Sequence, residues 1–478
     1  MPVPLISERP FKSLRRSLDK GSASGRLLGA RSYFSKIPVE IIGLIFEHAT
    51  HSDEDIKRTE VILSHVCRHW RAVALNTATL WTSMAIDMSK HISPATFLIT
   101  GTRILTYLAR SKFRLIDVWL NIAGTQLSYH RIHLMDALVN HIARWRRLTV
   151  LTNSESQTFL VSRMLGDRYT PNLESVTVRL DSAVTNNDSI SLDPLVFRNG
   201  APKLSYLSLD VSSSRFYLPP LQNVTTLLFC AAVYQPPCFT FKTFCTVLCL
   251  PSLGALSLHQ DICGPPLDSD ILGNLSLPNL RHLRLDASPV ITNLLMYFNA
   301  PNLESLIIEN VDLGSSSDTG EPTYLKDPST CFPSLKYLTL SGADPTSPSS
   351  AIPIARMTRS VEHLMVSDYT FCIIYDVDWT NEEVGIWPNL CSLTVCCGCP
   401  VGYGSGSGGF AEPSYFLQGA QTRRGMTYRF MPETLEGMRN NRLEDLNELM
   451  AFCNIEEITN VSAITDGEWP PSHIKYSL

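Results

Sequence analysis

The sequence repeats one short phrase, a Leu-x-x-Leu-x-Leu spacing of apolar residues, often with a proline two positions before the first leucine. Taking the first apolar residue of each copy as its anchor, the copies begin at Leu115, Trp145, Leu173, Leu204, Val224, Leu253, Leu280, Leu303, Leu335, Val361 and Leu390. Neighbouring anchors are 20 to 32 residues apart. Because every copy must adopt a similar local structure, this repeat constrains the fold more than composition does.

The spacing inside the phrase predicts a short strand. Residues three and five positions after the anchor lie on the same face of a strand, as Leu207 and Leu209 do after Leu204. One strand cannot bury that face alone, whereas stacked copies form a continuous core. The sequence therefore predicts an α/β solenoid with a parallel sheet over residues 111–397.

Residues 36–84 have a different, helical periodicity. Ile41, Ile42 and Ile45 recur at helical spacing after Pro38, which suits the first turn of a helix. After a polar turn, a second helix is predicted whose apolar face carries the following residues: Ile62, Val66, Trp70 and Val73. A small helical module is therefore expected before the repeats.

The helical module resembles an F-box. Residues 37–46, Ile-Pro-Val-Glu-Ile-Ile-Gly-Leu-Ile-Phe, are similar to the opening Leu-Pro-x-Glu-Ile-Leu-x-x-Ile-Phe of that family. Residues 66–74 resemble its Val-Cys-Arg-x-Trp-Arg half, and Leu80-Trp81 its closing pair in fungal members, although Ala78 replaces a common proline. The resemblance implies contact with a Skp-type adaptor through these residues: Ile37, Pro38, Ile41, Ile42 and Ile45.

The repeats resemble the leucine-rich repeat family, with one departure. That family usually has Asn or Cys eight residues after the anchor, but this chain has Asp181, Ser212, Asp261, Ser288 or Val311 there. We therefore expect no asparagine ladder and an uneven curvature. The two resemblances together predict a short N-terminal helical F-box followed by an irregular leucine-rich-repeat solenoid.

The remaining segments differ from both regions. Residues 1–35 are rich in Arg and Ser and predict a disordered basic arm, with a mitochondrial targeting segment as the alternative. A helical connector is expected at 85–110 and a Gly/Ser-rich flexible insertion at 398–425. Residues 426–478 predict a C-terminal helix and cap.

The order of these parts suggests a function. The F-box resemblance implies the substrate-recognition subunit of a Skp-cullin-F-box type ubiquitin ligase, which reaches the cullin through the adaptor and has no catalytic residue. The alternative is an interaction scaffold whose F-box-like helices only cap the solenoid. A protein target of unknown identity would bind side chains facing away from the solenoid core: Trp119, Tyr206, His259, His282, Arg284, Tyr337 and His363.

Composition excludes several other classes of protein. A net charge of −5 argues against non-specific nucleic-acid binding, and no apolar stretch is long enough to span a membrane. His65 and His69 have the spacing of a two-histidine metal site, but the Glu of the metalloprotease pattern and a third ligand are missing. Cys391 begins a cysteine cluster that has no second paired cluster at zinc-ribbon spacing. We therefore expect no metal, no cofactor, and a cytoplasmic or nuclear location.

Overall fold

The structure is a computed structural model that divides into two compact units, Met1–Trp81 and Thr82–Leu478. It describes residues 37–51, 59–88, 94–123, 129–180, 192–230, 239–260, 262–264, 275–287, 295–310, 331–341, 351–367, 387–396 and 425–458. The expected basic arm at 1–35 lies outside the described residues, as does the expected insertion at 398–425 apart from Gly425.

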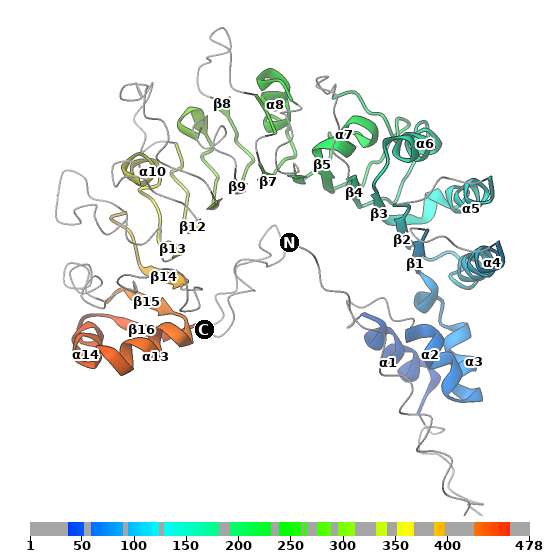
Figure 1. The fold of residues 1–478 in the computed structure, drawn as a ribbon, viewed down its shortest axis with the longest axis horizontal. Coiled ribbons are helices and arrows are strands. Elements are labelled where there is room, and N and C mark those ends of the chain that lie inside the picture. The colour runs from blue at the N-terminus through cyan, green and yellow to red at the C-terminus, as the bar shows by residue number, and fades with distance from the viewer. Residues whose placement is uncertain are drawn as a thin grey trace, which may run out of the picture. The chain divides into compact units, whose positions relative to one another are not determined.

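The first unit is helical (Figure 1). It contains α1 (Val39–His51), α2 (Thr59–Val66), α3 (Arg68–Asn76) and the short 3-10 helix η2 (Ala78–Trp81). Its buried core includes Ile42 and Phe46 from α1, Val73 from α3, and Trp81. Phe46 packs edge-on against Trp70 with ring centroids 5.0 Å apart, and Trp81 Nε1 donates a 2.8 Å hydrogen bond to the Ala74 carbonyl.

The predicted second helix is two helices, which corrects the sequence interpretation. The chain is extended at Cys67, with φ −156° and ψ 172°, and the Cys67 sulfur accepts a hydrogen bond from the Trp70 amide at 3.4 Å. Cys67 therefore caps α3 instead of continuing α2. The break rotates the two segments relative to each other, so Ile62 and Val66 are exposed whereas Val73 is buried.

The second unit is built on a sheet of 14 strands in the order β1-β2-β3-β4-β5-β6-β7-β9-β11-β12-β13-β14-β15-β16. The strands are β1 (Ser83–Asp87), β2 (Ile116–Asn121), β3 (Trp145–Thr152), β4 (Ser175–Leu180), β5 (Tyr206–Asp210), β6 (Thr226–Cys230), β7 (Ala255–His259), β9 (His282–Asp286), β11 (Ser305–Glu309), β12 (Tyr337–Ser341), β13 (His363–Ser367), β14 (Ser392–Cys396), β15 (Thr427–Phe430) and β16 (Asn454–Glu457). Every described pair is parallel, as in β4 with β5 and β5 with β6.

Helices connect many of the strands and lie on one side of the sheet (Figure 1). They are α4 (Pro94–Arg110), α5 (Tyr129–Val139), η3 (Ile142–Arg144), α6 (Glu155–Leu165), α7 (Val211–Tyr217), α8 (Phe241–Leu248), η5 (Leu295–Tyr297), α10 (Ala351–Met357), α13 (Pro432–Asn441) and α14 (Leu443–Phe452). A further parallel pair, β8 (Leu275–Ser276) with β10 (Phe298–Asn299), lies outside the main sheet.

The strand register explains why one phrase recurs. Leu207, Leu227 and Leu256 are partners in adjacent strands, and all three are fully buried. The anchor Leu204 is also buried. Stacking of the strands places the two apolar strand residues of each copy beside those of the following copy, so all copies share one core. This confirms the predicted α/β fold, a short N-terminal helical region followed by a long parallel sheet.

The sheet extends beyond the predicted solenoid at both ends. Strand β1 lies before the predicted start at 111, and the buried residues Trp81, Met84 and Ile86 have the apolar spacing of the phrase. Strands β15 and β16 lie in the predicted cap, where the expected final helix is split into α13 and α14 at Arg442. The copy at β1 was missed because it contains no leucine, and β15 and β16 were missed because each lacks one of the three apolar residues of the phrase.

The structure contains an asparagine ladder at a position other than the one that the leucine-rich-repeat pattern uses. It lies one position before the anchor, where a side-chain amide donates to a backbone carbonyl of the preceding repeat at 2.6–3.1 Å. The donors are Asn172, Asn223, Asn279 and Asn302. Ser252 Oγ makes an equivalent 2.8 Å bond to the Gln222 carbonyl. These bonds satisfy carbonyls of the segments that lead into the N-terminal ends of the strands.

Candidate interaction surfaces

Helix α1 of the first unit presents branched apolar side chains to solvent. Ile41 is 46% exposed and Ile45 is 51% exposed, and because they are four residues apart they lie on one side of the helix. Pro38 is exposed and Ile37 is half-buried just before the helix. Ile42 differs from the other predicted adaptor residues, since it is only 2% exposed and packs in the core.

A groove lies on the opposite side of α1, between α1 and α3. It encloses about 390 Å³, and its lining residues are Val39, Glu40, Gly43, Leu44, Glu47, His69, Ala72, Val73, Asn76 and Thr77. Glu47 at its wall accepts a hydrogen bond from Thr79 Oγ1. Sequence reasoning missed this groove because α1 was assigned a single contact face. Helical spacing could have placed Val39 and Gly43 together.

The sheet of the second unit has an open face, formed by residues two, four and six positions after each anchor. All predicted target-binding residues lie on this face and are half-buried: Trp119, Tyr206, His259, His282, Arg284, Tyr337 and His363. The register divides the face into three rows across the strands. It brings some of these residues into contact and keeps Trp119 and Tyr206 apart, on β2 and β5.

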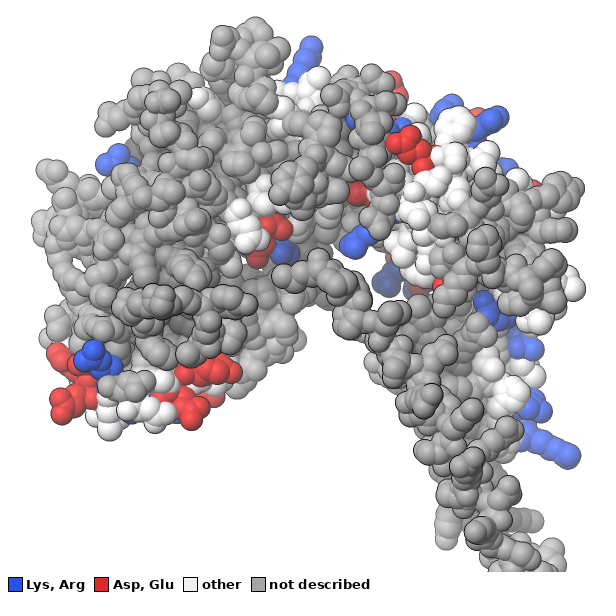
Figure 2. Space-filling view, in the orientation of Figure 1, with Lys and Arg blue, Asp and Glu red and all other residues white. Residues whose placement is uncertain are grey.

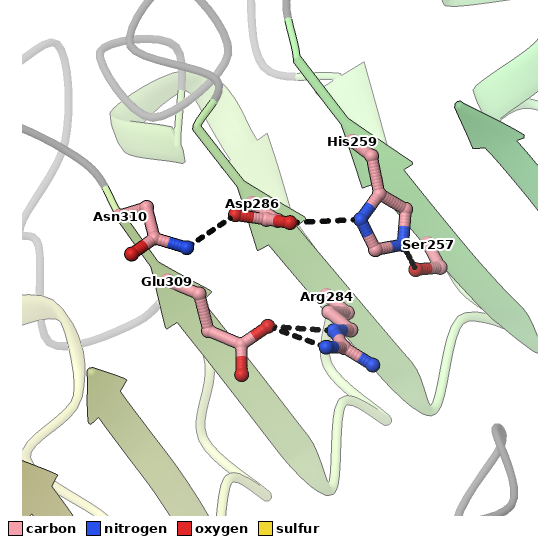
Figure 3. A network of polar contacts seen from close by, with 6 residues as sticks. All are labelled: Ser257, His259, Arg284, Asp286, Glu309 and Asn310. Carbon is pink, nitrogen blue, oxygen red and sulfur yellow. Dashed lines mark hydrogen bonds and ion pairs between the residues drawn. The ribbon is translucent and has the colours of Figure 1, made fainter. Parts of the chain in front are cut away.

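The centre of the open face holds a network of polar side chains from β7, β9 and β11 (Figure 3). His259 Nδ1 lies 2.9 Å from Asp286 Oδ2, and Asn310 Nδ2 donates to Asp286 Oδ1 at 2.8 Å. Arg284 Nε donates to Glu309 Oε2 at 2.7 Å. The hydrogen bond from His259 lowers the pKa of Asp286, whereas burial raises the pKa of Glu309.

The same network has the order of a Ser-His-Asp triad, because Ser257 Oγ lies 3.2 Å from His259 Nε2. A carboxylate only accepts hydrogen bonds, so His259 Nδ1 carries the proton that is donated to Asp286. However, Ser257 is 0% exposed, which closes its hydroxyl to a substrate. The arrangement is therefore best explained as a set of bonds that joins neighbouring strands.

A second network joins the strands near the C-terminal end of the sheet. Tyr337 and His363 are stacked with ring centroids 4.9 Å apart, and His363 Nδ1 lies 2.8 Å from Ser392 Oγ. Arg429 reaches Ser392 Oγ at 3.2 Å and donates through Nε to Glu456 at 2.8 Å. Burial lowers the pKa of His363. These contacts fix the orientation of Tyr337 and His363.

Asp210 connects the open face to the helical side. Its carboxylate accepts hydrogen bonds from the amides of Leu180 and Ser213, the latter at 2.6 Å, and so caps the N-terminus of α7. Burial raises the pKa of Asp210 to about 6, and its hydrogen bonds partly oppose this shift. The carboxylate therefore titrates just below neutral pH.

Charges outside the open face are distributed unevenly. Figure 2 shows acidic side chains gathered over the C-terminal helices α13 and α14. The acidic residues of these helices are Glu433, Glu436, Glu444, Asp445 and Glu448.

Within the described ranges, no cluster of three or more His, Cys, Asp or Glu residues is arranged to hold a metal ion. His65 and His69 lie in different helices, α2 and α3.

Comparison with protein families identifies the first unit. Residues 34–87 match the model of the F-box-like family, so the chain carries an F-box-like domain at its helical end. A comparison with curated proteins found no relative of the chain. Among the described helices, none has the length and apolar character required to cross a membrane.

Proposed function

We propose that this protein is the substrate-recognition subunit of a Skp-cullin-F-box type ubiquitin ligase. The observation that carries the proposal is the pairing of an F-box-like domain, whose α1 exposes Ile41 and Ile45, with a long parallel sheet that presents an open polar face. F-box domains commonly bind Skp-type adaptors. The adaptor would link the chain to a cullin.

The exposed apolar residues of α1 support adaptor docking by helix packing. Full burial of an exposed isoleucine contributes about 1.5–3 kcal/mol. Ile41 and Ile45 are already about half covered, so covering the rest of each would contribute about half of that amount. Ile42 would contribute indirectly, because it packs beneath these residues and holds α1 on the core. The groove lined by Val39 and Leu44 offers a second apolar surface to the same partner.

The open face supports the recognition half of the proposal. Tyr337, His363 and Arg284 are held by neighbouring side chains, so little rotamer freedom would be lost when a target binds. Aromatic residues and arginine are also the types that dominate protein interfaces. The protein would thus contribute proximity instead of chemistry, in the cytoplasm or nucleus.

Adaptor capture by the full-length chain tests this proposal. The wild-type protein is expected to bind a purified Skp-type adaptor, and an Ile41→Asp, Ile45→Asp double variant is expected to lose at least 100-fold in affinity, equivalent to about 2.7 kcal/mol. Both positions are exposed, so the folded first unit tolerates the change, as circular dichroism should show.

The matched control replaces two exposed apolar residues of α4 in the second unit, Leu98→Asp and Ile99→Asp, and should bind the adaptor normally. If the wild-type chain fails to bind, or if the α1 variant binds as tightly as the control, the ligase proposal is wrong. The chain would then be an interaction scaffold whose helical domain has another role.

A further inference from the structure

Most charged side chains on the open face are neutralised by a neighbour. Arg146 binds Asp117 through two hydrogen bonds of 2.9 and 2.6 Å, Arg284 binds Glu309, and Arg429 binds Glu456. His259 and Asp286 form a further pair. These charged groups already bind one another within the sheet, so a ligand could bind them only by breaking these contacts.

Arg147 in β3 and Arg179 in β4 are different. Both side chains are exposed, and within the described part of the sheet neither forms an ion pair or hydrogen bond. The charge of Arg179 instead acts at longer range on Tyr206 and Cys230, whose pKa values are raised by burial and partly lowered again by this arginine. Figure 2 shows basic side chains in this part of the molecule.

The strand register fixes how these two cations are placed. Arg147 is the partner of Ser175, and Arg179 lies four residues further along β4 on the same face. From the rise of a strand and the distance between strands, their Cα atoms are about 14 Å apart. An extended peptide covers that distance in about four residues, so its side chains i and i+4 would face the two arginines.

The surface between and around the two arginines suits a peptide. Thr149, Thr177 and Ser175 supply hydroxyl groups in the rows between them. Trp119 lies beside Thr149 on β2, and Tyr206 lies beside Ser175 on β5. Aromatic side chains at the two sides of a polar strip can cover the apolar parts of a bound segment while the hydroxyls bond its backbone.

We propose that the β2–β5 part of the open face binds an acidic peptide segment, with two anionic side chains four residues apart paired to Arg147 and Arg179. This inference rests on the proposed function, because it names the chemistry of the target segment. A solvated arginine needs no partner, but these two share a face on which the other arginines are paired. Asp117 and Asp210 lie beside them in the adjacent strands, but these carboxylates are bonded to Arg146 and to backbone amides. The two guanidinium groups therefore keep their donors available to an anionic ligand.

Synthetic peptides test the inference with the full-length protein. The probe is a fluorescent 12-residue Ser-Ala peptide with Glu at positions 4 and 8, compared with one carrying Gln at both positions and one carrying phosphoserine. Fluorescence anisotropy at low salt should show at least tenfold tighter binding of the Glu or phosphoserine peptide than of the Gln peptide. Whichever anionic peptide binds more tightly shows whether the site prefers a carboxylate or a phosphate. Added salt should weaken the binding of both anionic peptides.

Variants assign the binding to the two arginines. Arg147→Gln and Arg179→Gln should each weaken binding of the anionic peptide by about tenfold, as loss of a charge-assisted hydrogen bond predicts. Arg168→Gln is the control, because Arg168 is exposed in the turn after α6 and lies off the open face. Equal affinity for the Glu, phosphoserine and Gln peptides, or unchanged binding by the double variant, would overturn the inference.

The same double variant separates this inference from the proposed function. Arg147→Gln, Arg179→Gln protein should still capture the Skp-type adaptor, because both positions lie in the second unit. If the wild-type chain does not bind the adaptor, the ligase proposal is wrong, but the measured affinity for the acidic peptide still stands. Loss of peptide selectivity with intact adaptor capture would remove only the acidic-segment inference.

Discussion

The first unit and the sheet of the second unit expose chemically different surfaces. Helix α1 exposes aliphatic side chains such as Ile41, Leu44 and Ile45, whereas the open face of the sheet carries hydroxyl, imidazole and paired ionic groups. An aliphatic surface gains most of its binding energy from being covered, with little dependence on direction. A face of oriented polar groups selects its ligand by geometry and charge.

The cores of the two units also differ, in the size and arrangement of their side chains. The first unit relies on a few large side chains, with Trp81 and Phe46 fully buried in a small helical domain. The sheet relies on long rows of medium-sized residues such as Leu207 and Leu256, each making similar contacts to the next strand. One substitution is therefore expected to affect the whole first unit but only a local part of the sheet.

The largest effect is expected from Trp81→Ala. This change removes a buried indole and its hydrogen bond to the Ala74 carbonyl, and should destabilise the first unit by about 3–5 kcal/mol. Hydrogen exchange followed by mass spectrometry should show faster exchange in α1 and α3 with little change in β7 to β12. Unchanged exchange in α1 would contradict the contrast between the two cores.

A matched pair of neighbouring isoleucines tests the sheet. Ile308 is 0% exposed in the apolar row, while Ile307 lies half-buried on the open face. We expect Ile308→Ala to cost about 2–5 kcal/mol and Ile307→Ala less than about 1 kcal/mol. Urea unfolding of both variants measures the difference, and similar losses would mean that the two faces of β11 are not distinct.

The smallest effect concerns Asp210, whose carboxylate caps α7. Asp210→Ala should cost about 1–2 kcal/mol, whereas Asp210→Asn keeps an oxygen that can accept from the Ser213 amide and should cost less. Chemical denaturation at neutral pH provides this measurement. A loss in the Asn variant equal to that in the Ala variant would argue against capping as the main role.

The same residue predicts a pH dependence with a definite sign. Burial raises the folded pKa of Asp210 from 3.8 to about 6, so the folded state binds the proton more tightly than the unfolded state. The contribution of this group to stability is therefore greatest below about pH 4 and is lost as the pH rises through 6. Asp210→Asn should remove that part of the pH profile, and a profile identical to wild type would contradict the assignment.

Much of the fold could be predicted because it depends on short-range patterns. The period of two in each phrase identified Leu207 and Leu209 as core residues and placed Tyr337 and His363 on the opposite face. The helix break at Cys67 could not be read in this way, because apolar spacing continues across it. The asparagine ladder was missed because the family pattern directed attention to a different position, although the repeated Pro-Asn-Leu of the sequence contains it.

The candidate sites depended more strongly on tertiary structure. Ile41 and Ile42 are neighbours of the same residue type, yet only packing against α3 and Trp81 decides that one is exposed and the other buried. The sequence also contains Arg146 and Arg147 side by side. A register shift between β2 and β3 makes Asp117 the strand partner of Arg147, yet the Asp117 carboxylate bonds the side chain of the neighbouring Arg146.

The sequence alone determined that this protein has an F-box-like helical module followed by a stacked parallel sheet, because local periodicity and motif residues are sufficient to specify such elements. The tertiary structure decided which side chains meet across strands, including His259 with Asp286 and Arg284 with Glu309. Copies of the phrase are separated by unequal lengths of chain, so only the hydrogen-bonded register sets which residues lie opposite one another.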